Sequence, residues 1–219
     1  MLEGLQHLPQ PIIQHILNKS HERTFYPDVW NVSNLEGCLR KYYYTRKYGG
    51  LYKPNIRSLW NFYRGHLLDD EFSPLFPENQ RAVTATRNGA TIVGHFDFKY
   101  DNMIYDLKTA HEGKMYYLRK RGPDQNNVKQ LQDYMELYDH PKIGRGRLLY
   151  MSFKPDPIQF DVPRDNQAVN NLWVKINNIK WALEHDQPSI LPETWKDSKE
   201  RWRCSPEYCE YRSECVNRR

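Results

Sequence analysis

Two acidic residues and one lysine stand on neighbouring segments of the chain with a spacing that could bind a metal ion. Asp106 and Lys108 are separated by one residue in segment 103–109, so in a β-strand both would point to the same face of the sheet. Asp97 lies in segment 91–100, which a short turn brings back alongside the first. Crowded carboxylates repel each other unless a hard divalent cation such as Mg²⁺ or Mn²⁺ lies between them. The pattern therefore predicts metal-dependent hydrolysis, in which Lys108 holds water or offsets developing charge.

Three other polar residues could join this chemistry, although each has an ordinary structural explanation. His66 lies on a predicted helix over residues 58–72, on a face shared with apolar side chains, so we expect it to point inward. A core histidine bonded to a backbone carbonyl is the alternative. Gln130 and Tyr134 stand one turn apart on a predicted helix over residues 125–138, where they could also be polar positions of an amphipathic surface. An isolated Asp-x-Lys pair is likewise usually a solvated ion pair.

The elements that must position these residues alternate between helices and strands. Segments 81–86, 91–100 and 103–109 are joined by Asn88-Gly89 and Asp101-Asn102, which predicts a three-stranded antiparallel meander. Further strands are expected at 147–153 and 158–162. We expect helices at 2–19, 33–50, 58–72, 125–138 and 165–184. The one at 33–50 would start with a Ser33-x-x-Glu36 capping box, which would place Cys38 in its first turns.

Composition limits the class of protein without deciding its function. The chain has 219 residues, of which 39% are hydrophobic and 27% charged, and it shows no apolar run of spanning length. We therefore expect one large domain with or without a small appendage, and no membrane partner. The N-terminus lacks the pattern of a secretory signal, which indicates a reducing, cytoplasmic location. A formal net charge of +5 fits a polyanionic partner, but many proteins that never touch nucleic acid share it.

The four cysteines form an upstream thiol and a C-terminal group of three. Cys38 stands alone, whereas Cys204-x4-Cys209-x5-Cys215 falls within twelve residues. Such a set suits a metal centre that clamps the tail against upstream helices. Zinc, two disulfides or unpaired thiols are the alternatives. Zinc sites prefer C-x2-C pairs and disulfides are disfavoured in a reducing compartment, but spacing alone does not separate iron–sulfur from zinc.

The polar motifs, taken in order, resemble the RecB-like branch of the PD-(D/E)XK nuclease superfamily. The matching elements are His66, Gly94-x-x-Asp97, Asp106-Leu107-Lys108 and Gln130-x-x-x-Tyr134. The resemblance implies an α/β restriction-endonuclease-like core, with a mixed sheet flanked by helices. The metal ligands that it implies are His66, Asp97, Asp106 and the main-chain carbonyl of Leu107. It also implies that Lys108 is the catalytic lysine and that Gln130 and Tyr134 position DNA or the lysine. Phe96 and Asp106 depart from the Pro and Glu of the superfamily name.

The arrangement of cysteines is similar to a subset of these nucleases, the iron–sulfur exonucleases that include the CRISPR-associated Cas-four family. This resemblance implies a cluster, most often 4Fe-4S with 2Fe-2S also found, held by Cys38, Cys204, Cys209 and Cys215. The x4 spacing after Cys204 is longer than the family's usual x2. The implied organisation is an N-terminal helical part (1–78), a nuclease core (79–186) and a C-terminal tail (187–219), with the cluster joining the helical part to the tail.

The resemblance implies a metal-dependent DNA exonuclease that acts on single-stranded ends or overhangs in CRISPR adaptation, beside integrase subunits. A free-standing repair, recombination or viral exonuclease without CRISPR partners is one alternative. A non-catalytic DNA-binding module with a structural metal cluster is another. Basic residues mixed with tyrosines at 40–44, 47–48 and 114–121 would suit a single strand, unless those rings pack in the core.

Overall fold

The computed structural model describes residues 9–19, 25–49, 56–140, 142–197, 200–206 and 208–217. It falls into two units. The sheet unit consists of Asp28–Gly37 and Leu67–Ile176, and the helical unit consists of Met1–Pro27, Cys38–His66 and Asn177–Arg219. The division into 1–78, 79–186 and 187–219 stays a prediction. No helix among the described residues is long and apolar enough to cross a membrane.

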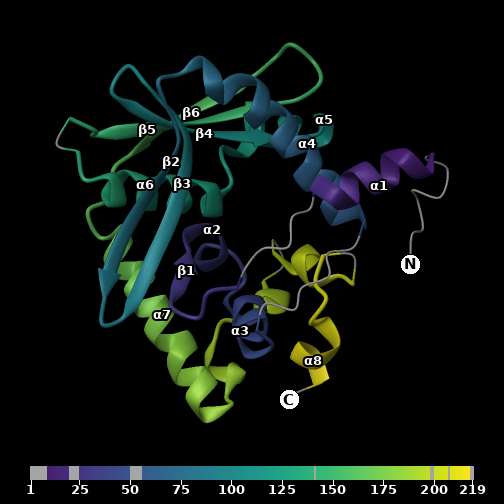
Figure 1. Ribbon diagram of the computed structural model, residues 1–219, viewed down its shortest axis with the longest axis vertical. Coiled ribbons are helices and arrows are strands. Elements are labelled where there is room, and N and C mark those ends of the chain that lie inside the picture. Colours follow the sequence, from purple (N-terminus) through teal and green to yellow (C-terminus); the bar gives the residue numbers. More distant parts are fainter. Residues whose placement is uncertain are drawn as a thin grey trace. The chain divides into compact units, whose positions relative to one another are not determined.

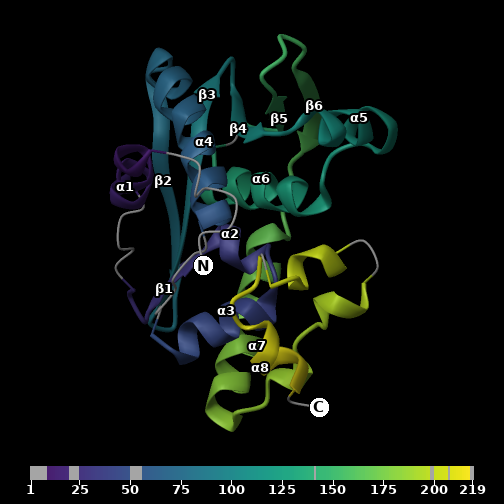
Figure 2. The same ribbon diagram turned by 90° about the vertical axis from the view of Figure 1, so that its right-hand side faces the viewer.

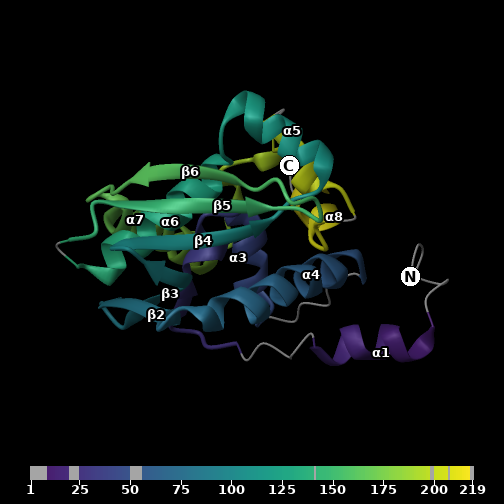
Figure 3. The ribbon, with the colours of Figure 1, turned by 90° about the horizontal axis from the view of Figure 1, so that it is seen from above.

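The sheet unit is built on six strands in a mixed sheet (Figures 1 and 3). The strands are β1 (Val29–Asn31), β2 (Glu78–Arg87), β3 (Ala90–Tyr100), β4 (Met103–Thr109), β5 (Arg145–Met151) and β6 (Ile158–Pro163). β2, β3 and β4 pair antiparallel, as do β5 and β6, whereas β1 with β3 and β4 with β5 are parallel. The α/β fold with a mixed sheet flanked by helices, expected from the sequence, is thus confirmed.

The meander expected at β2, β3 and β4 is confirmed, and its two turns have the chemistry that their residues predict. Asn88 and Gly89 have φ values of 49° and 72°, and Asp101 and Asn102 have 49° and 56°. Two consecutive positive φ values follow the twist of paired strands, and Asn, Asp and Gly tolerate them best. The turns therefore set the register that brings β3 and β4 together.

Helix α6 (Gln125–Tyr138) packs against the sheet (Figure 2). It begins where Asp124 accepts a hydrogen bond from the Asn126 N–H, as its capping position predicts. Its buried side, which includes Leu131 and Met135, joins the core of the sheet unit. The other helices of the unit are α2 (Val32–Leu35), α5 (Glu112–Arg121), the short 3-10 helix η1 (Ser73–Leu75) and parts of α4 (Ile56–Phe72) and α7 (Ala168–His185).

The helical unit combines α1 (Gln10–Lys19), α3 (Leu39–Lys47) and α8 (Arg212–Asn217) with the remaining parts of α4 and α7. Three short 3-10 helices, η2 (Pro188–Ile190), η3 (Thr194–Lys196) and η4 (Arg201–Cys204), carry the C-terminal segment. Its packing is largely aromatic, since Tyr44, Tyr48 and Tyr211 stack with ring centroids 5.7–6.3 Å apart. These rings tie α3 to the tail.

Several expected elements differ from the structure. The continuous helix over 33–50 is wrong, because α2 ends at Leu35 and α3 begins at Leu39. Ser33 lies inside α2 rather than at its cap, and Cys38 is the extended N-cap of α3, with φ −81° and ψ 112°. Gly37, a poor helix former, lies at the break. Of the helix expected at 2–19, α1 starts at Gln10, and residues 1–8 lie outside the described residues.

β1 and α5 are among the elements that were not foreseen. β1 has only three residues, too few to show an alternating pattern. In α5 only Met115 and Leu118 are buried, so the segment lacks the apolar repeat of an amphipathic helix. Both elements depend on the neighbours against which they pack, which the local sequence does not report.

Candidate active site

The structure brings Asp97 of β3 and Asp106 of β4 together, with Lys108 beside them. The β3–β4 ladder ends at the Phe98–Tyr105 pair, and the next step in that register sets Asp97 opposite Asp106. Instead of a ladder bond, the Leu107 N–H donates to Asp97 Oδ2 at 2.5 Å. Lys108 Nζ lies 2.9 Å from Asp106 Oδ1 and 2.7 Å from Oδ2. Two acids and one ammonium therefore share one small region, as their spacing predicts.

This meeting point is a gap along one edge of β3. β1 pairs with β3 only through Val93, and β4 pairs with it only from Phe98 onward, so residues 94–97 lie between the two partners. Beside the gap, stacked rings hold the last pair in register: the Phe98 centroid is 4.8 Å from Tyr105 and 4.0 Å from Phe76. Asp97 thus lies in a stretch of β3 whose edge is not paired with either β1 or β4.

The two carboxyl groups have raised pKa values. Burial is the main cause for Asp97, whose pKa is raised to about 7, and the charges of Asp106 and Asp69 add to it. Burial also raises the pKa of Asp106, which is 2% exposed, although Lys108 opposes the shift. Burial disfavours the charged form of Lys108, but Asp106 and Asp97 outweigh it and raise the lysine pKa. Lys108 therefore stays charged. The negative charge of the two carboxylates together exceeds what this one ammonium neutralises.

A divalent cation fits this donor set. Hard cations such as Mg²⁺ take carboxylate and carbonyl oxygens, and Asp106 Oδ2 accepts no hydrogen bond from the described residues, its partner being the Lys108 ammonium. The described residues nevertheless contain no group of three or more His, Cys, Asp and Glu side chains placed to hold an ion. The ligand set of Asp97, Asp106 and the Leu107 carbonyl therefore stays a prediction.

Tyr134 and Gln130, the pair that was ambiguous in the sequence, lie beside the acids. Gln130 Nε2 donates to the Tyr134 hydroxyl at 2.5 Å, and Tyr134 is 4% exposed. Burial and then the charge of Asp106 raise the tyrosine pKa, while Lys108 lowers it, so its hydroxyl is within electrostatic reach of both. A positioning role for this pair stays a prediction.

Gly94 makes room for this tyrosine. A Cβ atom at Gly94 would lie 2.6 Å from Tyr134 Cε1 and 2.8 Å from Cδ1, far inside van der Waals contact. Glycine is therefore required for α6 to approach β3 this closely. The Gly-x-x-Asp spacing thus has a physical basis, since one end admits the ring and the other supplies a carboxylate.

Two further residues at the site, Gln80 and Asp69, were not predicted to belong to it. Gln80 lies opposite Asp97 in β2 with φ 44°, and its Nε2 is 3.5 Å from Asp97 Oδ1. No sequence signal predicts a left-handed residue within a strand. Asp69 of α4 raises the pKa of Asp97 through its charge, although the sequence suggests an ordinary solvated acid. The site is therefore more acidic than the two motif residues imply.

The expected inward orientation of His66 is wrong. His66 is exposed, as are Phe62 and Leu67, which are 45% and 50% exposed. The buried side of α4 is set instead by Leu59, which packs with Ile16 of α1 and with Trp60 and Tyr63. His66 as a metal ligand stays a prediction.

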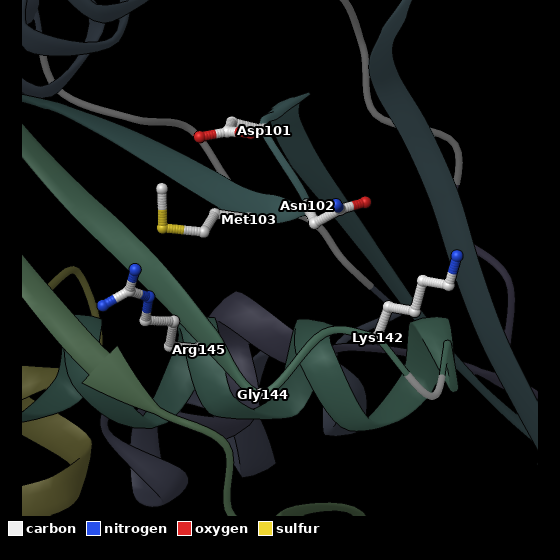
Figure 4. Close-up of a pocket in the computed structure, with 6 residues that line it drawn as sticks. All are labelled: Asp101, Asn102, Met103, Lys142, Gly144 and Arg145. Atoms are coloured by element: carbon white, nitrogen blue, oxygen red, sulfur yellow. The ribbon is translucent and has the colours of Figure 1, made fainter.

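A shallow hollow lies at the opposite end of β4 (Figure 4). It has a volume of about 390 Å³ and is lined by Asp101, Asn102, Met103, Lys142, Gly144 and Arg145. The residues come from the β3–β4 turn and from the segment that enters β5. Its residues are separate from the acid pair.

A second carboxyl pair is buried where α2, α6 and α7 meet. Asp133 is 2% exposed and Glu36 is 6% exposed, and the Lys175 ammonium bonds to Glu36. Burial and then the charge of Glu36 raise the pKa of Asp133 to about 9, against the opposing charge of Lys175. A pKa of about 9 favours the protonated form of Asp133 at neutral pH.

This pair predicts a pH-dependent stability. Because the folded-state pKa of Asp133 is above its unfolded value of 3.8, the folded chain holds the extra proton, and stability falls as pH rises from about 4 to about 9. Asp133→Asn keeps a donor without the titration. Urea melts give the free energy of unfolding of this variant and of the parent. We expect the variant's value minus the parent's to increase by about 1–3 kcal/mol between about pH 5 and pH 8. If the difference in the free energy of unfolding between Asp133→Asn and the parent stays constant across this range, the raised pKa of Asp133 is contradicted. Asp101→Asn, an exposed change of the same kind, serves as the control.

The four cysteines gather within the helical unit as free thiols. Burial raises the pKa of Cys204 and Cys215 and raises that of Cys209 to about 11, and Cys38 raises all three further. The Thr194 hydroxyl donates to Cys38 Sγ at 3.1 Å. The thiols therefore influence one another electrostatically, although within the described part of the chain no three of them are placed to hold an ion.

Cations from the start of α3 face these thiols. Arg40 is 4% exposed and lowers the pKa of Cys215 and Cys204, and Lys41 lowers that of Cys209. Arg40 also bonds to the carbonyls of Leu191 and Ser189 at 3.0 and 3.1 Å. Four thiols with buried positive charge beside them, which favours loss of their protons to a metal, suit a soft metal or an iron–sulfur cluster.

The fold is one shared with exonucleases. No family model and no curated protein sequence matches the chain. Among solved structures it resembles SSO0001, with a TM-score of 0.60 and 17% identity over 91% of both chains. It also resembles LHK-Exo, an alkaline exonuclease from Laribacter hongkongensis, with a TM-score of 0.56 and 13% identity over 78% of this chain and 96% of that one. The same exonuclease in complex with dAMP gives 0.51 and 14%, again over 78% and 96%. These likenesses establish the α/β fold.

Proposed function

We propose that the chain is a divalent-metal-dependent DNA exonuclease of the RecB-like type. The observation that carries the proposal is the convergence of Asp97, Asp106 and Lys108 at the gap beside β3. The fold shared with LHK-Exo supports it, and that exonuclease has been solved with a nucleotide, dAMP. With a divalent ion bound, the buried Asp106, the half-buried Asp97 and Lys108 would together carry a net positive charge, which suits an anionic phosphodiester better than a neutral substrate.

Asp97, Asp106 and the Leu107 carbonyl would hold the ion, with His66 as a further proposed ligand. When bound, the ion would activate water and neutralise charge on the phosphate. Lys108, held charged by the acids, would stabilise the negative charge that develops as the bond breaks. Gln130 donates to the Tyr134 hydroxyl, and we propose that this pair keeps the acid–lysine group in place.

The test is digestion of end-labelled DNA. We expect the purified chain to shorten labelled single strands, or overhangs, with Mn²⁺ or Mg²⁺, and to leave them intact with a chelator. Digestion that continues in chelator, or none with either metal on any DNA, would refute the proposal. Circular single strands separate exonuclease from endonuclease action, because only the latter opens them.

We further propose that Cys38, Cys204, Cys209 and Cys215 hold an iron–sulfur cluster. The shared electrostatic neighbourhood of the four thiols and the cations Arg40 and Lys41 support this. An anaerobically purified chain should be brown and contain iron and sulfide, and Cys209→Ser should lose both. A colourless protein that contains zinc and no iron would exclude the cluster.

For the biological setting we propose trimming of DNA ends for CRISPR adaptation, which rests on the sequence resemblance. A role in repair or in a virus uses the same chemistry. Copurification with integrase subunits from the native host supports the CRISPR setting, and its absence together with a genome that lacks those subunits refutes it.

A further inference from the structure

One face of α5 presents two tyrosine rings and two cations to solvent. Tyr116 and Tyr117 are 53% and 56% exposed, although Met115 beside them is buried. The two rings meet edge to face with centroids 5.8 Å apart. Lys120 Nζ lies 4.4 Å from the Tyr116 ring, and the Arg121 guanidinium lies 5.4 Å from that of Tyr117. We refer to Tyr116, Tyr117, Lys120 and Arg121 as the α5 tyrosine face.

The charges on this helix favour an anionic partner. Four of its ten residues are basic and one is acidic. That acid, Glu112, accepts a hydrogen bond from Ser152 and pairs with Lys154 at 3.3 Å. Lys120 and Arg121 contact the tyrosine rings and have no acidic partner among the described residues. Their charge is therefore available to a ligand.

The α5 tyrosine face is anchored close to the acid pair. Glu112, the first residue of α5, follows Lys108 by four residues, so their Cα atoms are at most about 15 Å apart. Two contacts tie the helix to the loop after β5: Glu112 bonds to Ser152, and Arg119 bonds to Asp156 at 2.5 Å. That loop also carries Phe153, which is 90% exposed. A strand crossing α5 would thus be near the catalytic residues.

The tyrosines of α3 provide a comparison, because their segment has a similar composition but a different environment. Residues 40–44 have the same basic and aromatic composition, yet Tyr42, Tyr43 and Tyr44 are 4%, 0% and 1% exposed. Those rings are therefore part of the core. On α5 the rings stay outside the core although each exposes a large apolar area, which is a signature of a contact surface.

We propose that the α5 tyrosine face binds single-stranded DNA, with bases stacked on Tyr116 and Tyr117 and phosphates held by Lys120 and Arg121. The inference rests on the proposed function, since it supplies the strand to the acid pair. Stacking on an aromatic ring accepts any base and is worth about 1–3 kcal/mol per base. The bases of an intact duplex are already stacked and paired, so the rings would select an unpaired strand.

The test measures binding without cleavage. Fluorescence anisotropy of a labelled oligothymidylate, in chelator, gives the affinity of each variant. We expect Tyr116→Ala/Tyr117→Ala to bind about 10-fold or more weakly, and Tyr116→Phe/Tyr117→Phe to stay within about 2-fold, because the rings remain. Tyr100→Ala, which removes an equally exposed tyrosine (59%) from the same unit, should also stay within about 2-fold.

The salt dependence tests the cations separately. Each phosphate contact to a single strand contributes about 0.7 to the slope of log affinity against log salt, so Lys120→Gln/Arg121→Gln should reduce that slope by about 1.4. Unchanged binding by Tyr116→Ala/Tyr117→Ala would overturn the proposal, as would an equal loss with a duplex probe. A parent that digests DNA while the alanine variant binds normally refutes the α5 site alone. A parent that neither binds nor digests DNA refutes the proposed function instead.

Discussion

Asp106→Asn should reduce metal-dependent digestion of single-stranded DNA by about 1,000-fold or more, and Lys108→Gln by about 100- to 1,000-fold. Asp106 is the most deeply buried acid of the site and the direct partner of the lysine at 2.7 Å. Asparagine keeps the shape but removes the charge that a divalent ion needs. Initial rates on an end-labelled strand at saturating Mn²⁺ give both values.

The controls for this pair come from the hollow at the other end of β4. Asp101→Asn and Lys142→Gln make the same chemical changes at exposed positions, and asparagine tolerates the left-handed conformation of residue 101. Both should retain parental rates. If Asp106→Asn and Lys108→Gln digest DNA as the parent does while circular dichroism shows all proteins folded, the site is elsewhere.

Gly94→Ala should lower both stability and activity although it adds a single methyl group. The added Cβ would lie 2.6 Å from the buried ring of Tyr134 and 3.2 Å from Val32 Cγ2, so β3 and α6 must separate. We expect a loss of about 1–3 kcal/mol in the free energy of unfolding. A displaced Tyr134 should also misplace the acid–lysine group and reduce the rate by about 10- to 100-fold.

Gly144→Ala is the matched control, because nothing lies within 4 Å of a Cβ at that position and its backbone is ordinary. The double variant Gly94→Ala/Tyr134→Ala tests the cause. If the methyl group and the ring collide, the loss of stability in the double variant should be smaller than the sum of the two single losses. Strict additivity would show that Gly94 acts by some other route.

The acid–lysine group could be predicted from the sequence because it depends on local rules. Asp106 and Lys108 follow the two-residue period of a strand, and the Asp101-Asn102 turn dictates that β3 returns beside β4. The helix that carries Gln130 and Tyr134 follows from its cap at Asp124. The mixed sheet flanked by helices follows from the order of these elements.

The features that could not be predicted depend on tertiary contacts. His66 is exposed because Ile16, remote in sequence, selects the buried side of α4. The left-handed Gln80 and the charge of Asp69 at Asp97 have no local signal. Similar basic and aromatic segments also end in opposite environments, since the rings of α3 are buried whereas those of α5 face solvent.

The central claim is that Asp97 and Asp106 jointly bind a divalent ion. The most direct measurement is calorimetric titration of Mn²⁺ into the folded parent and into Asp97→Asn, Asp106→Asn and Asp101→Asn, with activity left out of the readout. The parent and Asp101→Asn should share a saturable site that Asp97→Asn and Asp106→Asn both lose. Undiminished Mn²⁺ binding by the Asp97→Asn and Asp106→Asn variants would contradict the account.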